Sequence, residues 1–520
     1  MTKTALALRS FRADFDALCS EKSHSRAIID ARTGRVWTYS AMHEAAAGVG
    51  ALLAAQGIRP GDRVFSILPN GVEQFFSFLA SLRLGADFCP ISPLSTASEA
   101  RRFALLCKSA VGLVPDSCDQ ALAEELRNAT SKKKLLRFAL GGDLPSGACA
   151  RAPASAAAAK LILFTSGTVS APKAIVIDTD RLWSSACAWT KFHSFLGHDS
   201  RFYNILPMSY LGGLFNLGLI PLACGGSFVI SDAFSAASAL QFWQEVRDGG
   251  VNTLWLAPTM LRALLALHRP DPELQKAYKQ IRVSFLGMAP CGLPDKERFE
   301  KTFGIPLLEN FALSETTFLS SEKLGDGLPR CPGSTGRPLP WVDMKFEAPA
   351  QGAPSEIAVK TPFLFDGYLT ASGKIDPPPT ADGHLRTGDL GALEDGGILV
   401  IKGRSKDVVK KGGYLVMLRE LEEAAAQHAA VAEAAAVGVP HDFYGETAIV
   451  FVRLRSAGQE RAAVEEVAKH LTTVLAKFKW PSQIVAVTEF PKTESGKTQK
   501  RLLLERLSAD RDELVSTLVK

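Results

Sequence analysis

The stretch RVFSILPNGVEQFFSFLASLRLGADFCPI, residues 63–91, decides the fold class of this chain. Each end is a short apolar run, which is typical of a strand buried on both faces. Between the two runs, residues 72–84 place apolar side chains at the three- and four-residue spacing of a helix. The stretch therefore predicts a strand–helix–strand unit, the building block of α/β folds.

The same alternation continues to about residue 400. Further strand-like and helix-like segments are SFVIS (227–231), QFWQEVRD (241–248), TLWLA (253–257) and MLRALLALH (260–268). Alternation of this kind favours largely parallel sheets flanked by helices. We expect a large N-terminal α/β domain over residues 1–402.

The pattern changes beyond residue 400. A charged segment, KGRSKDVVKKGGY (402–414), leads into a helical stretch, and strands and helices then mix without regular alternation. The expected elements are a helix over 418–427, strands at 431–439 and 447–454, a helix over 460–476 and a strand at 484–490. This order predicts a separate, smaller α+β domain over residues 403–520.

The composition is that of a globular enzyme rather than a disordered or nucleic-acid-binding chain. The chain has 520 residues, of which 47% are apolar and 22% charged, and its net charge is +5. That charge is too small and too dispersed to indicate nucleic acid as a partner. No segment approaches the ~18 apolar residues of a membrane span, and no signal peptide is evident at the start. The nine cysteines form no CxxC pair, so we expect reduced thiols and a cytoplasmic protein.

Two loops have the residue types of phosphate-binding sites. FTSGTVSAPK (164–173) packs four hydroxyls, a glycine and a lysine between two apolar runs. Such a loop is either a simple Ser/Thr-rich turn or a cradle whose N–H groups, hydroxyls and lysine wrap a polyphosphate. PKTESGKT (491–498) imitates a Walker A loop, but Pro491 replaces its first glycine, and too few residues follow for a nucleotide-binding sheet. Two interpretations of that second loop are left: a basic surface turn, or a mobile tip that holds a catalytic lysine, Lys497.

Eight motifs in order carry a family resemblance. They are FTSGTVSAPK (164–173), LPMSYLGGL (206–214), FLGMAPCGLP (285–294), NFALSETT (310–317), STGRPLP (334–340), LRTGDLG (385–391), GRSKDVVKKGGY (403–414) and PKTESGKTQKRLL (491–503). With this set the chain resembles the adenylate-forming superfamily of acyl- and aryl-CoA synthetases, adenylation domains and luciferases. Within it, the chain is most similar to AMP-forming acyl- and aryl-CoA ligases.

The resemblance implies a reaction in two halves. A carboxylic acid would attack the α-phosphorus of ATP, releasing pyrophosphate, and a thiol would then attack the acyl-adenylate. The cofactors and substrates implied are ATP, Mg²⁺ and coenzyme A, or a phosphopantetheine in its place. The small C-terminal domain would rotate between the two halves about a hinge at Lys406.

The resemblance also assigns a nucleotide site. The loop for the β- and γ-phosphates would comprise Thr165, Ser166, Gly167, Thr168 and Lys173. Residues expected around the adenine and ribose are Gly287, Ala289, Pro290, Phe311, Ser314, Asp389 and Arg404, of which Asp389 would accept hydrogen bonds from the ribose hydroxyls. Glu315, with Thr168, would hold Mg²⁺, since magnesium prefers hard oxygen ligands. Ala174 stands where the family usually has glycine, which predicts a stiffer loop.

Besides the hinge residue Lys406, two lysines receive catalytic roles and two glycines a channel role from the same resemblance. Lys497 would stabilise the charge that gathers on the α-phosphate in the first half-reaction. Lys410 would act in the second half-reaction, although a solvated basic turn is the alternative for it. Gly412 and Gly413 would line a narrow thiol channel, since the absence of side chains leaves it open.

The expected acid pocket contains Tyr210, Leu211, Gly213, Leu214, Asn310 and Ala312. The segment that holds the first four carries no carboxylate, whereas relatives that activate amino acids usually have an Asp there to pair with the ammonium group. We therefore expect a short, medium or aryl carboxylic acid rather than an α-amino acid. Asn310 and Ala312 replace residues that are often glycine, which predicts a shallow pocket.

Three alternatives for function follow from the sequence. In the first, CoA is the thiol acceptor. In the second, a freestanding adenylation enzyme loads the acyl group onto an acyl or peptidyl carrier protein. In the third, the chain is an inactive ATP-binding paralogue, against which the presence of Glu315, Asp389, Arg404 and Lys497 argues.

Overall fold

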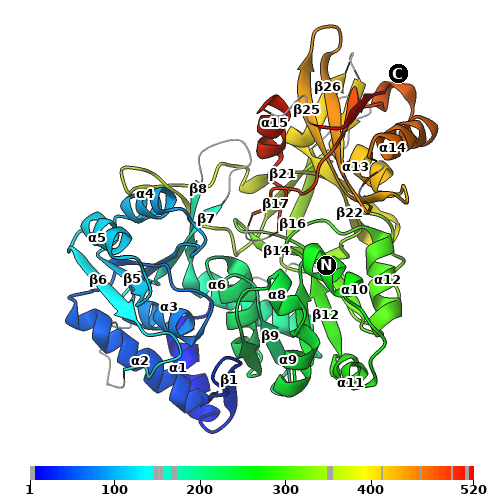
Figure 1. Ribbon diagram of the computed structural model, residues 1–520. Coiled ribbons are helices and arrows are strands. Elements are labelled where there is room, and N and C mark those ends of the chain that lie inside the picture. Colours follow the sequence, from blue (N-terminus) through cyan, green and yellow to red (C-terminus); the bar gives the residue numbers. More distant parts are fainter. Residues whose placement is uncertain are drawn as a thin grey trace.

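A computed structural model describes residues 6–145, 152, 156–165, 173–347, 355–411, 414–456, 458, 460–493, 496–509 and 514–519. Figure 1 shows a large lower body and a smaller unit, drawn yellow to red, above it. The expected mixed α/β architecture with a smaller C-terminal domain is confirmed. The two predicted domain boundaries at residues 402 and 403 stay a prediction.

The first large sheet has eight strands in the order β19-β18-β8-β7-β4-β3-β5-β6. Its strands are β3 (Arg63–Ser66), β4 (Asp87–Pro90), β5 (Val111–Pro115), β6 (Lys134–Phe138), β7 (Lys160–Thr165), β8 (Lys173–Asp178), β18 (Gly367–Leu369) and β19 (Ile375–Asp376). Strands β3 and β4 are parallel and are joined by helix α3 (Val72–Leu84), as the opening stretch predicts. Every residue of α3 is buried, because the helix lies inside the body rather than on its surface.

The second large sheet has nine strands in the order β15-β14-β13-β12-β11-β9-β10-β1-β2. They are β1 (Arg26–Asp30), β2 (Val36–Thr38), β9 (Arg201–Asn204), β10 (Ser227–Ile230), β11 (Thr253–Leu256), β12 (Val283–Leu286), β13 (Leu307–Leu313), β14 (Thr317–Ser321) and β15 (Arg337–Pro338). From β1 across to β13 every pairing is parallel. The carboxyl ends of these parallel strands therefore meet at one edge, where α/β proteins place their ligands.

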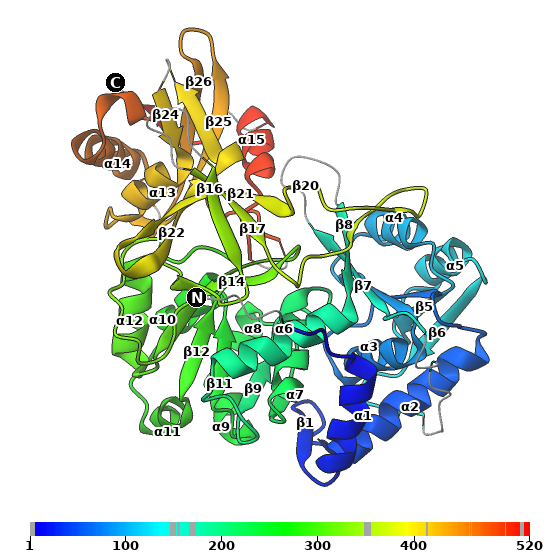
Figure 2. The same cartoon turned by 180° about the vertical axis from the view of Figure 1, so that it is seen from behind.

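Helices cover the two sheets and fill the space between them. They are α1 (Phe11–Glu21), α2 (Tyr39–Ala55), α4 (Ala97–Cys107), α5 (Gln120–Ala129), α6 (Thr179–Phe192), α7 (Ile220–Ala223), α8 (Ala236–Ala239), α9 (Phe242–Gly249), α10 (Pro258–Ala266), α11 (Pro272–Gln280) and α12 (Leu293–Phe303). One core of buried side chains joins both sheets to most of these helices, and a second cluster packs α4 and α5 against the eight-stranded sheet. Figure 2 shows α6 between the two halves of the body, seen from behind. Over the described ranges, every helix is too short or too polar to cross a lipid bilayer.

A third sheet lies between the large body and the C-terminal unit. It contains β16 (Asp343–Glu347), β17 (Ser355–Lys360), β20 (Thr380–Ala381), β21 (His384–Glu394) and β22 (Ile398–Arg404), and its pairings are antiparallel. A short 3₁₀ turn, η3 (Ser405–Asp407), follows β22. The chain thus leaves this sheet at Arg404 and enters the C-terminal sheet at Val408.

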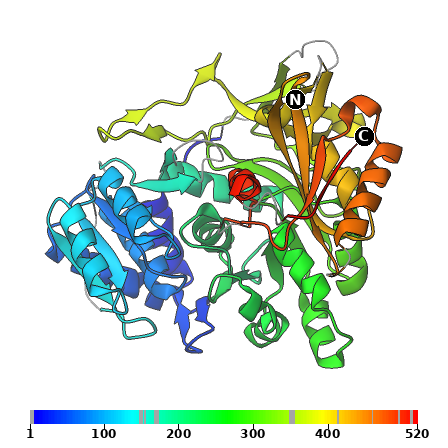
Figure 3. The ribbon, with the colours of Figure 1, turned by 45° about the horizontal axis from the view of Figure 1, so that its top comes forward.

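The C-terminal unit is a six-stranded mixed sheet with helices packed on it. Its elements are β23 (Val408–Lys411), β24 (Tyr414–Met417), α13 (Leu418–Ala426), β25 (Val431–His441), β26 (Gly445–Leu454), α14 (Glu460–Val474), η4 (Lys477–Lys479), β27 (Gln483–Ala486), α15 (Lys500–Ala509) and β28 (Ser516–Leu518). Two apolar clusters of its own form on the two faces of this sheet. In Figure 3, α15 lies above the junction of the two halves of the large body.

Candidate active site

An acid–base pair on neighbouring strands forms the fixed part of the site. Asp389 in β21 pairs in register with Arg404 at the end of β22, and Arg404 Nε donates to Asp389 Oδ1 at 2.9 Å. Asp389 is 4% exposed, and its second oxygen, Oδ2, is buried without a hydrogen-bond partner among the described residues. Burial raises the pKa of Asp389, while Arg404 and then Lys497 act in the opposite direction. A buried acceptor such as Asp389 Oδ2 could therefore accept a hydrogen bond from a hydroxyl group of a ligand.

Lys497 reaches this pair from the C-terminal unit. It lies in a tight hairpin in which the Thr493 N–H donates to the carbonyl of Lys497 at 2.8 Å. Its side chain is exposed to solvent, yet protein surrounds it on several sides. That surrounding protein desolvates the ammonium and lowers the pKa of Lys497; Arg404 adds to the effect, while Asp389 and Glu315 oppose it. The structure therefore brings together Asp389, Arg404, Glu315 and Lys497, which the sequence predicted from four separate motifs.

Glu315 lies in the connection between β13 and β14. Tyr368 in β18 donates its hydroxyl to Oε1 of Glu315 at 3.3 Å, and the Phe365 N–H donates to the Glu315 carbonyl at 2.8 Å. Burial first, and then Glu315, raises the pKa of Tyr368 to about 12, so the phenol stays a donor at neutral pH. Tyr368 also lies opposite Ile175 in β8. Glu315 is thus held beside the strand that follows the hydroxyl-rich loop.

The predicted phosphate loop lies largely outside the described residues. Ser166, Gly167 and Thr168 belong to this part, and so do Gly412 and Gly413 of the expected thiol channel. For Thr165 and Lys173 the backbone is described, and the two residues pair as the last rung of the antiparallel β7–β8 hairpin. The loop therefore connects two adjacent, hydrogen-bonded strands, as the sequence predicted.

A π-helix, η1 (Gly212–Leu219), follows Tyr210 in the LPMSYLGGL motif. Asn204, fully buried at the end of β9, donates to the carbonyls of Gly213 and Leu217, both at 2.9 Å. These two bonds tie the end of β9 to the π-helix. A Cβ on Gly213 would lie 2.5 Å from the carbonyl oxygen of Leu206, so this position accepts glycine alone. Isolated π-helices occur frequently at functional sites.

Tyr210 points toward the β13–β14 connection. Its hydroxyl forms a 2.7 Å hydrogen bond with Oγ of Ser314, the residue before Glu315. Burial raises the pKa of Tyr210, and Ser314 acts in the opposite direction. The structure therefore links the predicted acid pocket directly to the predicted nucleotide and metal residues.

The remaining pocket residues lie at the carboxyl ends of β12 and along β13. Asn310 Nδ2 donates to the carbonyl of Leu286 at 2.9 Å, and a Cβ on Gly287 would lie 3.0 Å from Asn310 Oδ1. Met288 has a φ of 72°, a backbone conformation that residues other than glycine rarely adopt. Such strained residues are often found at functional sites. Of the other predicted residues, Leu211 and Leu214 are buried in the main core, Phe311 and Ala289 are partly buried, and Ala312 and Pro290 are exposed.

Comparison with known proteins decides the family. The AMP-binding enzyme profile matches residues 15–369, and that of the AMP-binding enzyme C-terminal domain matches residues 420–497. The chain belongs to the AMP-binding enzyme family. Among its relatives, the sulfoacetate–CoA ligase of Cupriavidus necator is 31% identical over 91% of this chain and 93% of the relative. The oxalate–CoA ligase of Arabidopsis thaliana is 29% identical over 87% of this chain and 90% of the relative.

Solved structures agree with this membership. ATP-bound MatB from Rhodopseudomonas palustris superposes with a TM-score of 0.84 at 26% identity, covering 96% of this chain and 99% of that one. The apo form of MatB gives a TM-score of 0.73 at 27% identity, covering 95% and 98%. Overall, the structure of this AMP-binding enzyme is therefore more similar to the ATP-bound structure than to the apo structure.

The segment between the two domains carries Lys406 and Lys410. Lys406 is exposed in the η3 turn, where Ser405 Oγ donates to the carbonyl of Gly388 at 3.2 Å. Lys410 is exposed in β23, and its N–H donates to Glu446 Oε2 at 2.7 Å. The position of Lys406 at the change of sheets agrees with a hinge, but the roles predicted for both lysines stay predictions.

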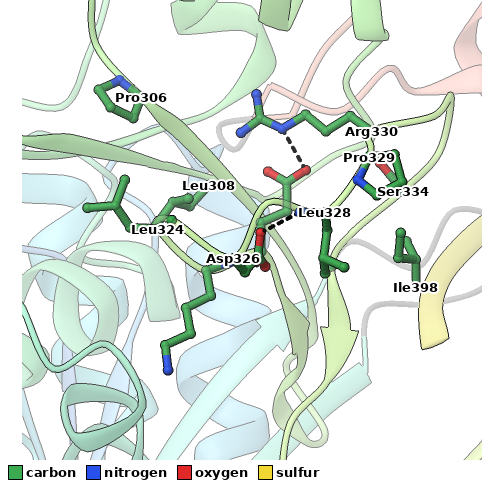
Figure 4. Close-up of a pocket in the computed structure, with 13 residues that line it drawn as sticks. Pro306, Leu308, Leu324, Asp326, Leu328, Pro329, Arg330, Ser334 and Ile398 are labelled. Atoms are coloured by element: carbon green, nitrogen blue, oxygen red, sulfur yellow. Dashed lines mark hydrogen bonds and ion pairs between the residues drawn. The ribbon is translucent and has the colours of Figure 1, made fainter. Parts of the chain in front are cut away.

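A pocket elsewhere in this AMP-binding enzyme holds none of the predicted site residues. It measures about 170 Å³, and its lining includes residues 322–326 and 328–330 with Pro306, Leu308, Ser334, Gly336 and Ile398 (Figure 4). An ion pair between Glu322 and Arg330, 3.0 Å apart, forms part of its wall. We therefore assign no role in the proposed reaction to this pocket.

Sequence reasoning missed three residues that the structure places at the site. They are Tyr368, Met288 and Asn204. Tyr368 contacts Glu315 only because β18 pairs with β8, and no local sequence signal marks that contact. Met288 stands within the FLGMAPCGLP motif, where a non-glycine residue between Gly287 and Ala289 could have been identified as unusual.

Proposed function

We propose that this chain is an AMP-forming ligase that joins a small carboxylic acid to the thiol of coenzyme A through an acyl-adenylate. One observation carries the proposal: Lys497 of the C-terminal domain lies among Asp389, Arg404 and Glu315 of the N-terminal domain. A cation among carboxylates, beside a buried acceptor without a partner, suits a nucleotide whose α-phosphate gains charge during the reaction. The similarity to CoA ligases supports the same conclusion.

In the first half-reaction, Asp389 Oδ2 would accept a hydrogen bond from a ribose hydroxyl while Arg404 holds the carboxylate in place. An oxygen of the substrate carboxylate attacks the α-phosphorus, and the bond to the bridging oxygen of pyrophosphate breaks. Lys497 would stabilise the negative charge on the α-phosphate oxygens and the approaching carboxylate. Glu315 and Thr168 would hold Mg²⁺, which supplies charge neutralisation for the departing pyrophosphate.

The proposed acid is short, medium-sized or aromatic and carries no α-ammonium group. The segment from Tyr210 to Leu214 offers no carboxylate to pair with such a group. Asn310 and the Tyr210–Ser314 hydrogen bond take space from the floor and wall of the pocket. Relatives that act on sulfoacetate, oxalate and malonate support small acids.

The proposed acceptor is coenzyme A rather than a carrier protein. Beside Lys410, the rings of Tyr414 and Phe478 stack with centroids 4.8 Å apart, and Lys411 Nζ lies 5.1 Å from the ring centre of Tyr444. These aromatic side chains are largely exposed on the C-terminal domain. Exposed rings with lysines between them suit an adenine ring and phosphates, the nucleotide part of CoA.

The test is a panel of acids in two assays. ATP–pyrophosphate exchange reports acyl-adenylate formation, and thioester formation with CoA or with a phosphopantetheinylated carrier protein reports the acceptor. The panel contains sulfoacetate, oxalate, malonate, benzoate, hexanoate, glycine and palmitate. Exchange with a small acid and transfer to CoA support the proposal. Exchange with glycine alone, transfer to the carrier protein alone, or ATP binding without any exchange would each contradict it.

A further inference from the structure

In the hairpin that carries Lys497, Gly496 lies against a side chain of the N-terminal domain, that of Thr259. Gly496 has a φ of +81°, and the three atoms nearest to a Cβ built there all belong to Thr259. Such a Cβ would lie 2.7 Å from Oγ1, 3.3 Å from Cγ2 and 3.5 Å from the Cβ of Thr259. Thr259 lies in the first turn of α10, on the other domain. Glycine therefore permits a close approach that any side chain would prevent.

The hairpin is rigid enough to transmit that contact to Lys497. The Gly496 N–H donates to the carbonyl of Thr493 at 2.8 Å, and the Gln499 N–H donates to the carbonyl of Pro491 at 2.7 Å. With the Thr493-to-Lys497 bond, three backbone hydrogen bonds close the loop. Because Lys497 directly follows Gly496, the position of Gly496 against Thr259 determines how far the Lys497 ammonium group reaches.

Charges link the same helix and the same hairpin. Arg262, one turn after Thr259 on α10, donates from Nε to Asp295 Oδ2 at 2.7 Å. Burial lowers the pKa of Arg262, but Asp295 and, across the domain boundary, Glu433 outweigh that effect. Glu433 is itself ion-paired with Lys492, at the base of the hairpin, at 2.8 Å. Glu433 of β25 thus interacts both with Arg262 of α10 and with Lys492 at the base of the hairpin.

We infer that the first turns of α10 form the docking point for the Lys497 hairpin, with Thr259 as the positioning residue for the first half-reaction. The contact with Gly496 sets the distance of closest approach, and Arg262 and Glu433 favour the approach electrostatically. The contact occurs in a structure that is more similar overall to ATP-bound than to apo MatB. The catalytic part of this inference rests on the proposed function, whereas the docking itself does not.

The experiment is a double-mutant cycle on Gly496→Ala and Thr259→Ala. In the presence of Thr259, Gly496→Ala should lower the rate of ATP–pyrophosphate exchange at least about tenfold and leave thioester formation from supplied acyl-adenylate within about twofold. In the Thr259→Ala background the same change should cost at least about fivefold less, because the clash is gone while the strain of a positive φ remains. Thr259→Ser keeps Oγ1 and should give no such relief.

Gly458→Ala is the matched control. Gly458 lies in the same domain with a φ of +97°, and nothing lies within 4 Å of a Cβ built there. It should carry the backbone strain alone, so exchange should change by less than about threefold. Equal losses from Gly496→Ala in both Thr259 backgrounds, or equal losses in both half-reactions, would overturn the inference.

Hydrogen–deuterium exchange separates this inference from the proposed function. With ATP bound, peptides over residues 257–262 and 491–499 should exchange faster in Gly496→Ala than in wild type, and recover in the double variant. Unchanged protection in Gly496→Ala would contradict the docking point. Protection that behaves as expected in a chain that shows no pyrophosphate exchange would support the docking and contradict the proposed function.

Discussion

The two halves of the candidate active site are built in different ways. Asp389 and Arg404 face each other on paired strands, and their 2.9 Å bond is fixed by the register of β21 and β22. Lys497 instead arrives on an exposed hairpin of another domain, and its position depends on how the two domains dock. We infer that strand pairing would give a permanent nucleotide site, whereas domain docking would give a charge, that of Lys497, that can be withdrawn. The comparison predicts that changes in the two halves affect different steps.

Removal of the Lys497 charge should have the largest effect on activity. Lys497→Ala should lower acyl-adenylate formation by a factor of about 10² to 10³, because the charge on the α-phosphate oxygens loses its stabilising cation. Thioester formation from supplied acyl-adenylate should stay close to the wild-type rate. Separate rate measurements of the two half-reactions test this, and an equal loss in both would argue against a role confined to the first step.

Restriction of the hinge should produce the reverse pattern. Lys406 lies in the η3 turn between β22 and β23, and proline there would fix φ near −65°. Lys406→Pro should reduce thioester formation about 100-fold while acyl-adenylate formation continues. The reason is that the C-terminal domain, which carries Lys497, could no longer rotate away. Pre-steady-state measurement of both steps is the test, with Lys406→Ala as the control for loss of charge. Normal thioester turnover in Lys406→Pro would exclude this residue as the pivot.

A change in the Asp389–Arg404 pair should weaken nucleotide binding and affect the rates of the two half-reactions less. Asp389→Asn keeps the shape but removes the charge that Arg404 neutralises and one acceptor for the ribose. We expect the Kd for ATP to rise about 10- to 100-fold, the value of one or two hydrogen bonds to a charged group. Isothermal titration calorimetry with ATP measures this directly. An unchanged Kd would mean that Asp389 Oδ2 does not face the nucleotide.

The same comparison shows how far the sequence alone reaches. Asp389, Glu315, Arg404 and Lys497 each stand in a short motif, and the resemblance carried by the ordered motifs predicted that they share one site. The β3–α3–β4 unit was predicted from hydrophobic periodicity, which depends on neighbours along the chain.

Features that depend on distant neighbours could not be predicted in the same way. Tyr368 meets Glu315 through the pairing of β18 with β8, and Thr259 meets Gly496 through domain docking. The π-helix at residues 212–219 requires Asn204, whose amide bonds form only once β9 lies against the helix. In each case the decisive contact joins elements that no local pattern connects.

The lowered pKa of Lys497 predicts an alkaline limit to the first half-reaction alone. The active form is the cation, so adenylation should be fully present below the lowered pKa and fall about tenfold per pH unit above it, at a lower pH than an ordinary lysine would give. A pH profile of kcat/KM for pyrophosphate exchange tests this prediction. Lys497→Arg is the control, because a guanidinium stays charged and should remove the alkaline limb while it lowers the rate. An alkaline limb that persists in Lys497→Arg would belong to another group.

The smallest expected effect concerns the acid pocket of the N-terminal domain and its preference among acids. Asn310 donates to the carbonyl of Leu286, and its Oδ1 lies against Gly287, so its side chain fills space at the carboxyl end of β12. Asn310→Gly should open that space and raise kcat/KM for a bulkier acid relative to a small one by about fivefold, the scale of one or two extra methylene groups accommodated in a pocket. The measurement is thioester formation with acids of increasing length and ring size, and Asn310→Ala should give an intermediate shift. ATP affinity and pyrophosphate exchange with the small acid should change little, since Asp389 and Arg404 keep their strand register. A wild-type preference for acids of about sixteen carbons would contradict the shallow pocket, because each added methylene would have to displace packed side chains.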